Sequence, residues 1–224
     1  VSNADPFQTF NELVGPTKTP RKIRRQLKEL RPSNSLAGVF LGLDVTPQHF
    51  GIDDYEIFYN TSWDSEAMYK AMMGGNYGDG LISMTFYTNL QDSFYAPQGK
   101  SVLVLHTYSN YDLWSDDSDE YARQKEKMVE ELITLAEEVM PGLRDHIAHK
   151  EGMTPKTLES YTLNYKGAPY GMDFTIDQRN RMDINTPIAG LYLAGSWAFP
   201  AHSVGMAQVS GFMAAKSILK EDNE

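Results

Sequence analysis

The last part of the chain holds the arrangement with the clearest potential for chemistry: an apolar run, a turn and a helix rich in small residues. Residues 190–195 read Gly-Leu-Tyr-Leu-Ala-Gly and predict a short strand that ends in glycine. Free amides at the start of the helix predicted over 204–220 attract negative charge, and small side chains let a ligand approach closely. Alone, this pattern fits either an anion site or simple tight packing. The small residues are Gly205, Ala207, Ser210, Gly211, Ala214 and Ala215.

Histidines are the other candidate reactive groups. His202 lies in the turn before the last helix, where it could polarise a substrate or bond a cofactor, or simply be solvated. His106 falls in a predicted strand and is expected to be an ordinary sheet residue. His146 and His149 are three residues apart, but no further ligands converge on them. The sequence therefore predicts no metal site there, only a solvated helix end.

Composition narrows the functional class. The formal net charge is -10 with a sequence pI near 5.0, which argues against nucleic acid as a partner and against simple electrostatic docking to anionic lipid. There is no cysteine, so disulfides and thiolate catalysis are excluded, and a reducing, cytoplasmic setting is favoured. The longest apolar run, around 36–43, is too short to span a bilayer.

The hydrophobic pattern predicts an α+β protein. A short helix capped by Asp5 comes first, and residues 167–185 are expected to be irregular. The strands at 81–87 and 101–108 should pair as an antiparallel hairpin with an irregular loop. Further strands are predicted at 35–44 and 55–59, and helices at 22–30, 65–73, 116–140 and after Pro155.

A cluster of methionines and aromatic residues in the middle of the chain permits two interpretations. Soft, adaptable side chains of this kind could line a channel for a long apolar substrate, or they could form an ordinary core beneath a sheet. The residues are Met72, Met73, Met84, Phe86, Tyr87, Phe94 and Tyr95.

The C-terminal segment resembles a known flavin motif. Residues 190–200, Gly-Leu-Tyr-Leu-Ala-Gly-Ser-Trp-Ala-Phe-Pro, with Val-Gly-Met-Ala at 204–207 and Ser-Gly-x-x-Ala-Ala at 210–215, closely resemble the C-terminal flavin motif of the phytoene desaturase family. That group includes carotenoid isomerases and retinol saturases. The opening Val-Ser-Asn-Ala-Asp-Pro and three internal segments, at 95–101, 140–145 and 166–171, are similar to the family in register. The resemblance therefore spans nearly the whole chain.

The resemblance implies FAD as cofactor and an apolar polyene or terpenoid-like substrate. The reaction would be desaturation, saturation or isomerisation by hydride transfer to or from the flavin. Two departures put the substrate and reaction in doubt: Ser196 stands where many flavoproteins carry an acidic residue, and Ala-His-Ser at 201–203 replaces a glycine-rich stretch. By position, the residues implied to contact the flavin are Gly195, Ser196, Trp197, Val204, Gly205 and Met206.

The same resemblance predicts the domain plan. Residues 1–15 and 185–224 would belong to a Rossmann-like FAD domain and meet in space, and 16–184 would form a substrate domain with a mixed or largely antiparallel sheet and helices on one side. A dinucleotide site needs a strand, G-x-G-x-x-G and a helix. Gly74-Gly75 follows a helix instead and is rejected. The chain is therefore expected to be a truncated, inactive fragment that needs a missing N-terminal FAD-binding segment, unless its start reflects processing or a tag.

Alternatives from other classes stay open. The chain could be a non-catalytic module that binds apolar ligands or a protein on a desaturase-like scaffold. An amine-oxidising flavoenzyme would need an aromatic cage, for which Trp197 and Tyr170 are the only hint. An apolar small molecule is the expected partner; a peripheral membrane contact and a homodimer are left open.

Overall fold

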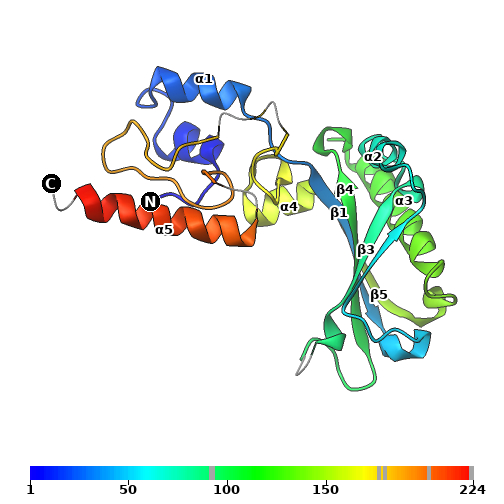
Figure 1. Ribbon diagram of the computed structural model, residues 1–224. Coiled ribbons are helices and arrows are strands. Elements are labelled where there is room, and N and C mark those ends of the chain that lie inside the picture. The colour runs from blue at the N-terminus through cyan, green and yellow to red at the C-terminus, as the bar shows by residue number, and fades with distance from the viewer. Residues whose placement is uncertain (91–93, 176–177, 179–180, 201–202, 222–224) are drawn as a thin grey trace. The chain divides into compact units, whose positions relative to one another are not determined.

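The computed structural model describes residues 1–90, 94–175, 178, 181–200 and 203–221, and it divides into two compact units (Figure 1). The sheet unit is Ser35–Thr157. The terminal unit joins Val1–Asn34 to Leu158–Glu224, so the two ends of the chain share one unit. Which unit holds flavin and which holds substrate is a matter of function, so the assignment of 16–184 to a substrate domain stays a prediction.

The sheet unit is built on a five-stranded antiparallel sheet in the order β2-β3-β4-β1-β5. The four predicted strands are confirmed, and β3 and β4 pair antiparallel as expected. The fifth was missed, because four of its seven residues are exposed and it lacks an apolar alternation. The bounds are β1 Ser35–Leu43, β2 Glu56–Asn60, β3 Leu81–Phe86, β4 Ser101–Ser109 and β5 Ile147–Met153.

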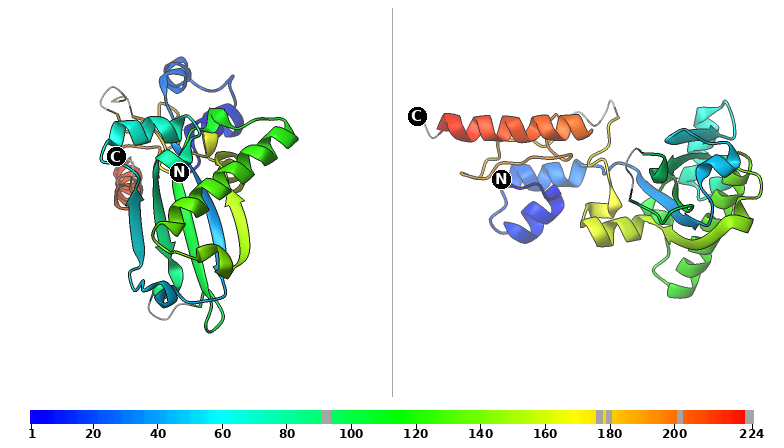
Figure 2. Two further views of the ribbon diagram at one scale, coloured as in Figure 1. Left: turned by 90° about the vertical axis from the view of Figure 1, so that its right-hand side faces the viewer. Right: turned by 90° about the horizontal axis from the view of Figure 1, so that it is seen from below.

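Two helices, α2 (Ser65–Met73) and α3 (Ser118–Glu137), cover one face of this sheet (Figure 2). Asp64 and Asp117 cap them, each accepting two backbone N–H bonds in the first turn. Alternate residues of the central strands face the helices and are fully buried. Met84 and Phe86, from the methionines and aromatics in the middle of the chain, lie in this core, and Met72 of α2 is also fully buried, which favours the core interpretation for these three.

The opposite face of the sheet mixes apolar and polar side chains. Phe40 on β1 is 43% exposed and Phe58 on β2 is 67% exposed. Near the centre lies His106, across from Ser83 in the ladder between β4 and β3. The Ser83 hydroxyl donates a 2.7 Å hydrogen bond to Glu56 Oε1. Burial lowers the pKa of His106 below its usual value, and the Glu56 carboxylate partly opposes that shift.

Acidification is expected to destabilise the sheet unit through His106. The pKa of His106 is lower in the folded state than in the unfolded state. As the pH falls below about 6.5, the unfolded chain therefore binds the proton first, which lowers the free energy of unfolding. This destabilisation stops increasing once the pH is below the pKa of His106 in the folded protein. A His106→Thr variant should lose this part of the pH dependence. The measurement is the free energy of unfolding in urea at several pH values between about 7.5 and 5. An unchanged slope in the variant would contradict the assignment.

The terminal unit packs three helical segments around the two ends of the chain: a π-helical turn at Gln8–Leu13, α1 (Arg21–Glu29) and α5 (Val204–Glu221). Another helix, α4 (Pro155–Thr162), connects the two units along the chain. The apolar face of α1 is buried, as its pattern predicted. The core includes Phe10, Ile23, Leu27, Leu30, Met172, Leu193, Trp197 and Ala214.

The predicted strand at 190–195 is reduced to single bridges. Ser2 pairs in parallel with Leu193, and Asn185 pairs antiparallel with Tyr192. One paired residue on each side is too few for a ladder, although the side chains of Tyr192 and Leu193 are buried. The described parts of 167–185 are irregular, as expected. No described helix is both long and apolar enough to cross a bilayer.

Candidate functional site

The turn at Gly195 is where the two ends of the chain meet. The Ser2 amide donates to the Tyr192 carbonyl at 2.8 Å, and the Ala194 amide donates back to the Ser2 carbonyl at 2.9 Å. Gly195 follows with φ of +92°, a conformation that favours glycine. A β-carbon there would collide with the Oδ1 atom of Asn3. Both the backbone and its neighbour therefore require glycine at this position.

Ser210 attaches helix α5 to this turn. Its side chain is fully buried, and its Oγ accepts a 2.8 Å hydrogen bond from the Gly195 amide. The same hydroxyl donates to the Ala207 carbonyl at 2.6 Å. The hydroxyl thus fixes the start of α5 next to the glycine turn, and both ends of the motif are held at one place.

The start of α5 is exposed and partly capped. Ser203 Oγ accepts a 3.1 Å hydrogen bond from the Met206 amide, and so occupies one of the amides implied to face a cofactor. Val204 is 80% exposed, and Gly205 beside it is also exposed. The amides of these two residues have no acceptor within the described part of the chain. His202, the candidate catalytic residue, lies outside the described residues.

Trp197 is an anchor of the fold at this site. It is 3% exposed and its Nε1 donates to Asn164 Oδ1 at 3.0 Å. Phe7 meets it edge-on and stacks on Tyr165, with ring centroids 4.1 Å apart. With its indole buried in this way, Trp197 does not offer a free wall for an aromatic cage. Ser196, next to it, lies close against Gly171, where a β-carbon would collide with the Ser196 carbonyl.

Asp5 joins the first helical turn to a segment 160 residues away. Its carboxylate is buried, and Oδ1 caps the turn by accepting from the Gln8 amide at 2.8 Å, as the sequence predicted. Oδ2 accepts from the Tyr165 amide, also at 2.8 Å. This second bond fixes the backbone of Tyr165, whose ring stacks on Phe7 next to Trp197.

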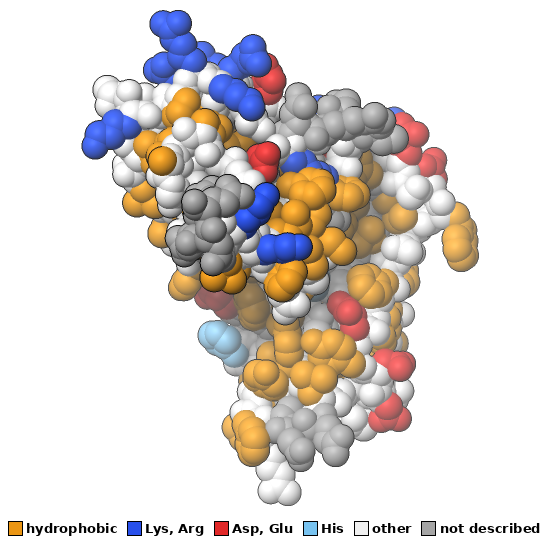
Figure 3. Space-filling model, turned by 60° about the vertical axis from the view of Figure 1, so that its left-hand side comes forward, with side chains coloured by type: hydrophobic (Ala, Val, Ile, Leu, Met, Phe, Trp, Pro, Cys, Tyr) orange, Lys and Arg blue, Asp and Glu red, His pale blue; other side chains and the backbone are white. Residues whose placement is uncertain are grey.

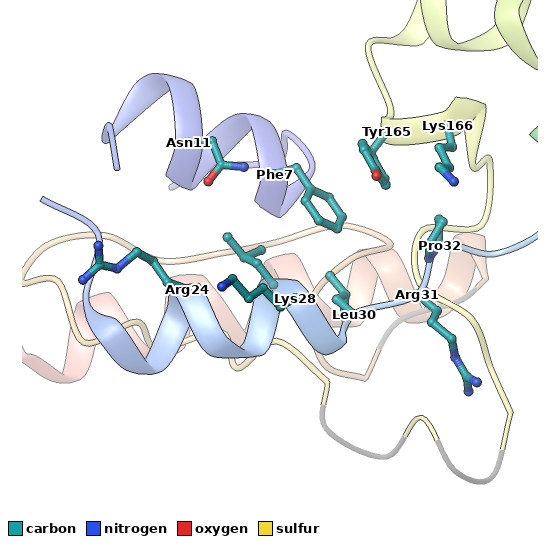
Figure 4. A pocket seen from close by; sticks show the side chains of 10 residues that line it. Phe7, Asn11, Arg24, Lys28, Leu30, Arg31, Pro32, Tyr165 and Lys166 are labelled. Atoms are coloured by element: carbon teal, nitrogen blue, oxygen red, sulfur yellow. The ribbon is translucent and has the colours of Figure 1, made fainter. Parts of the chain in front are cut away.

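A groove of about 550 Å³ opens in the terminal unit (Figure 4). Arg24 and Lys28 of α1, with Arg31 just after it, lie along one wall. Tyr165 and Lys166 lie across from them, and Phe7 and Asn11 complete the lining. The groove is therefore lined by several cationic side chains and by two aromatic rings.

The other histidine candidates lie in the sheet unit. His146 Nδ1 is 2.9 Å from Asp44 Oδ1, and its ring is 4.6 Å from that of His49 between centroids. His146 ends the short 3-10 helix Leu143–His146, as expected. His149 lies on the edge strand β5, so the expected helix end is wrong at that residue; pairing of β5 with β1, rather than local sequence, sets its conformation. Within the described ranges no group of three or more His, Asp or Glu residues is arranged to hold a metal.

Sequence reasoning did not assign the contacts that three residues make at the site. Asn3 contacts Gly195, Ser210 bonds its amide, and Asn164 holds Trp197. One signal was available: a serine on the buried face of a helix needs a partner for its hydroxyl, because buried polar groups are almost always hydrogen-bonded.

Known proteins resemble this chain along almost its full length. The family model described as flavin containing amine oxidoreductase matches residues 4–219. All-trans-retinol 13,14-reductase of Danio rerio is 27% identical over 87% of this chain and 35% of its own length. Prolycopene isomerase of Daucus carota is 30% identical over 97% of the chain and 34% of its own length. An inactive all-trans-retinol 13,14-reductase of Danio rerio is 25% identical over 98% of the chain. The chain thus spans about a third of the length of the first two relatives.

Proposed function

Because the chain belongs to the flavin-containing amine oxidoreductase family, we propose that it is the C-terminal portion of an FAD-dependent oxidoreductase acting on an apolar polyene or terpenoid-like substrate. The observation that carries the proposal is the Gly195 turn, held by Asn3 and Ser210 against the exposed start of α5. This arrangement places a glycine turn beside two helix-start amides that have no acceptor among the described residues.

The residues at this edge fit one wall of a flavin site. Gly195 and Ser196 would lie along the ribityl chain; the absence of a side chain at Gly195 makes room for Asn3 and keeps the turn tight behind that wall. The amides of Val204 and Gly205 would face the pyrimidine end and favour negative charge there. The Met206 amide contributes less, since Ser203 already occupies it. FAD, when bound, would supply the hydride acceptor or donor.

Helix α5 offers a surface that this chain leaves uncovered. Val209, Phe212 and Leu219 recur at helical spacing and are 41%, 70% and 63% exposed. Helices that are apolar on the outside as well as the inside are normally buried. We propose that residues outside this chain, including the strand and glycine-rich turn that seat the pyrophosphate, cover this face and complete the flavin site.

The proposed substrate class rests on apolar surface and on the relatives. Phe40 and Phe58 project from the face of the sheet opposite the helices, and the half-buried Tyr108 lies on the same side. Retinol and prolycopene, which appear in the names of the relatives, are long and apolar. A surface of aromatic side chains suits such molecules, because burial of apolar area drives their binding.

Flavin binding tests the proposal. The 224-residue chain and the longest natural polypeptide that contains it are each titrated with FAD, with flavin fluorescence as the readout. We expect no measurable binding to the chain alone, since one wall does not offset the cost of immobilising a dinucleotide. The longer polypeptide should bind FAD.

A matched pair of variants makes the test specific to the site. Gly205→Val in the longer polypeptide places bulk at the exposed start of α5 and should weaken FAD binding about 10-fold or more, a loss of about 1.4 kcal/mol. Gly211→Val puts the same side chain into open space further along α5 and should leave binding unchanged. If the longer polypeptide binds retinol but no FAD, the alternative of a non-catalytic apolar-ligand module is the better account.

A further inference from the structure

Charge is unevenly divided between the two units. The sheet unit has 8 Lys and Arg against 20 Asp and Glu, while the terminal unit has 12 against 10. The negative overall charge of -10 therefore comes from the sheet unit, and the terminal unit contains a basic region that the overall charge does not reveal. Figure 3 shows Lys and Arg side chains gathered over α1. The inference from net charge against contact with anionic lipid does not apply to this surface.

Helix α1 carries its cations without any visible compensation. Within the described residues no ion pair or hydrogen bond holds their side chains, and all five are exposed. No acidic residue lies in the first turn, where the helix dipole repels cations, and Pro20 at the N-cap gives no side-chain cap. The five cations, called the α1 cluster below, are Arg21, Lys22, Arg24, Arg25 and Lys28.

Helical spacing makes these charges repel one another. Arg21 is three and four residues from Arg24 and Arg25, and Lys28 is four and three residues from the same two arginines. Like charges at these spacings destabilise a helix. The opposite side of α1 is locked into the core by Ile23 and Leu27, so the cluster points permanently outward. These repulsions destabilise α1 on a face that is exposed to solvent, which points to a function for the charge.

We propose that the α1 cluster docks the terminal unit onto the surface of an anionic phospholipid bilayer. Clusters of four to eight cations on an amphipathic helix bind acidic headgroups. The outward face of α1 has no aromatic or apolar side chain that could serve as the anchor of a protein interface. A charged bilayer needs no such anchor, because it attracts flexible cations without a matching shape.

Two neighbouring features suit the same occupant. Leu13, the last residue of the π-helical turn that precedes α1, is 71% exposed and can enter the headgroup region beside the cations. Arg24 and Lys28 also line the groove of about 550 Å³, which offers space for a phosphate headgroup between cationic walls. Arg31 on the groove contributes less, since it bonds Asp173 and Thr175. The proposal is independent of flavin binding.

Vesicle sedimentation with the 224-residue chain tests it. The vesicles are phosphatidylcholine alone, and phosphatidylcholine with about 30% phosphatidylserine, each at about 0.1 M and about 0.5 M salt. We expect the chain to bind the vesicles that contain phosphatidylserine and not those of phosphatidylcholine alone. Binding to the anionic vesicles should be much weaker at the higher salt concentration. Changing Arg21, Arg24, Arg25 and Lys28 together to Gln should weaken it about 100-fold or more, since each cation near the surface contributes about five-fold.

A control variant removes the same charge elsewhere. Lys70, Lys100, Lys127 and Lys216 are also exposed, and changing them together to Gln should leave vesicle binding within about two-fold. Absence of binding to anionic vesicles overturns the proposal, as does equal binding to neutral vesicles or full binding by the α1 variant. Salt-sensitive self-association that the α1 variant abolishes, without vesicle binding, would overturn it in favour of contact with the acidic sheet unit of a second copy.

Discussion

Replacing Gly195 with alanine is expected to destabilise the terminal unit by about 2–4 kcal/mol, while the sheet unit keeps its stability. A residue with a β-carbon in a left-handed conformation costs about 1–2 kcal/mol, and here the added carbon also meets Asn3 Oδ1. Hydrogen exchange measured by mass spectrometry reads the two units separately, and it should show faster exchange around the Ser2 and Ala194 amides.

A double-mutant cycle separates the two causes. Asn3→Ala removes the side chain that the new β-carbon meets but leaves the backbone conformation unchanged. In the Asn3→Ala background, Gly195→Ala should cost at least about 1 kcal/mol less than in the parent. An identical cost in both backgrounds would mean that only backbone strain matters. A cost below about 0.5 kcal/mol in the parent would contradict the geometry of this turn.

The second large effect is expected at Asp5. Asp5→Ala removes the acceptor of two backbone amides, those of Gln8 and Tyr165, and leaves both without a partner inside the protein. Loss of a cap costs about 1 kcal/mol, and an unsatisfied buried amide costs about 1–3 kcal/mol more. We therefore expect about 2–4 kcal/mol of destabilisation, measured as the free energy of unfolding in urea.

Two variants bracket that prediction. Asp5→Asn keeps one acceptor oxygen for the Gln8 amide but presents an NH2 group to the Tyr165 amide. Its stability should therefore fall between those of the parent and Asp5→Ala. Asp64→Ala removes the exposed cap of α2, a purely local contact, and should cost only about 1 kcal/mol. Equal effects of Asp5→Ala and Asp64→Ala would show that the link to Tyr165 adds nothing.

The predictable parts of the fold were those with a strong local pattern. α2 is found over the predicted residues, and α3 begins and ends two to three residues inside its predicted range. β1 and β4 alternate between a buried side and a mixed side, which local sequence signals well. β5 was missed because it is an exposed edge strand, held in place by its pairing with β1.

The site was predictable only in outline. Its composition, with glycine, small residues and a helix start, could be found from the motif, and the first helical cap at Asp5 followed from local rules. The capping of Met206 by Ser203 follows from the same local rule, because a serine directly precedes the helix. The burial of Trp197 could not be predicted, because it depends on how the turn folds back on its neighbours. The net charge of -10 argued against contact with anionic lipid, but a net charge does not show where on the protein the cations lie.

The sequence by itself determined most of the elements and the family resemblance, because periodicity and short motifs are written in neighbouring residues. The tertiary structure alone decided that Asn3 requires glycine at 195, that Ser210 bonds that glycine, and that Asp5 reaches Tyr165. Two of these three contacts join residues more than 150 positions apart. Such contacts leave no period in the chain, because only the packing of one unit from two distant segments brings the atoms together.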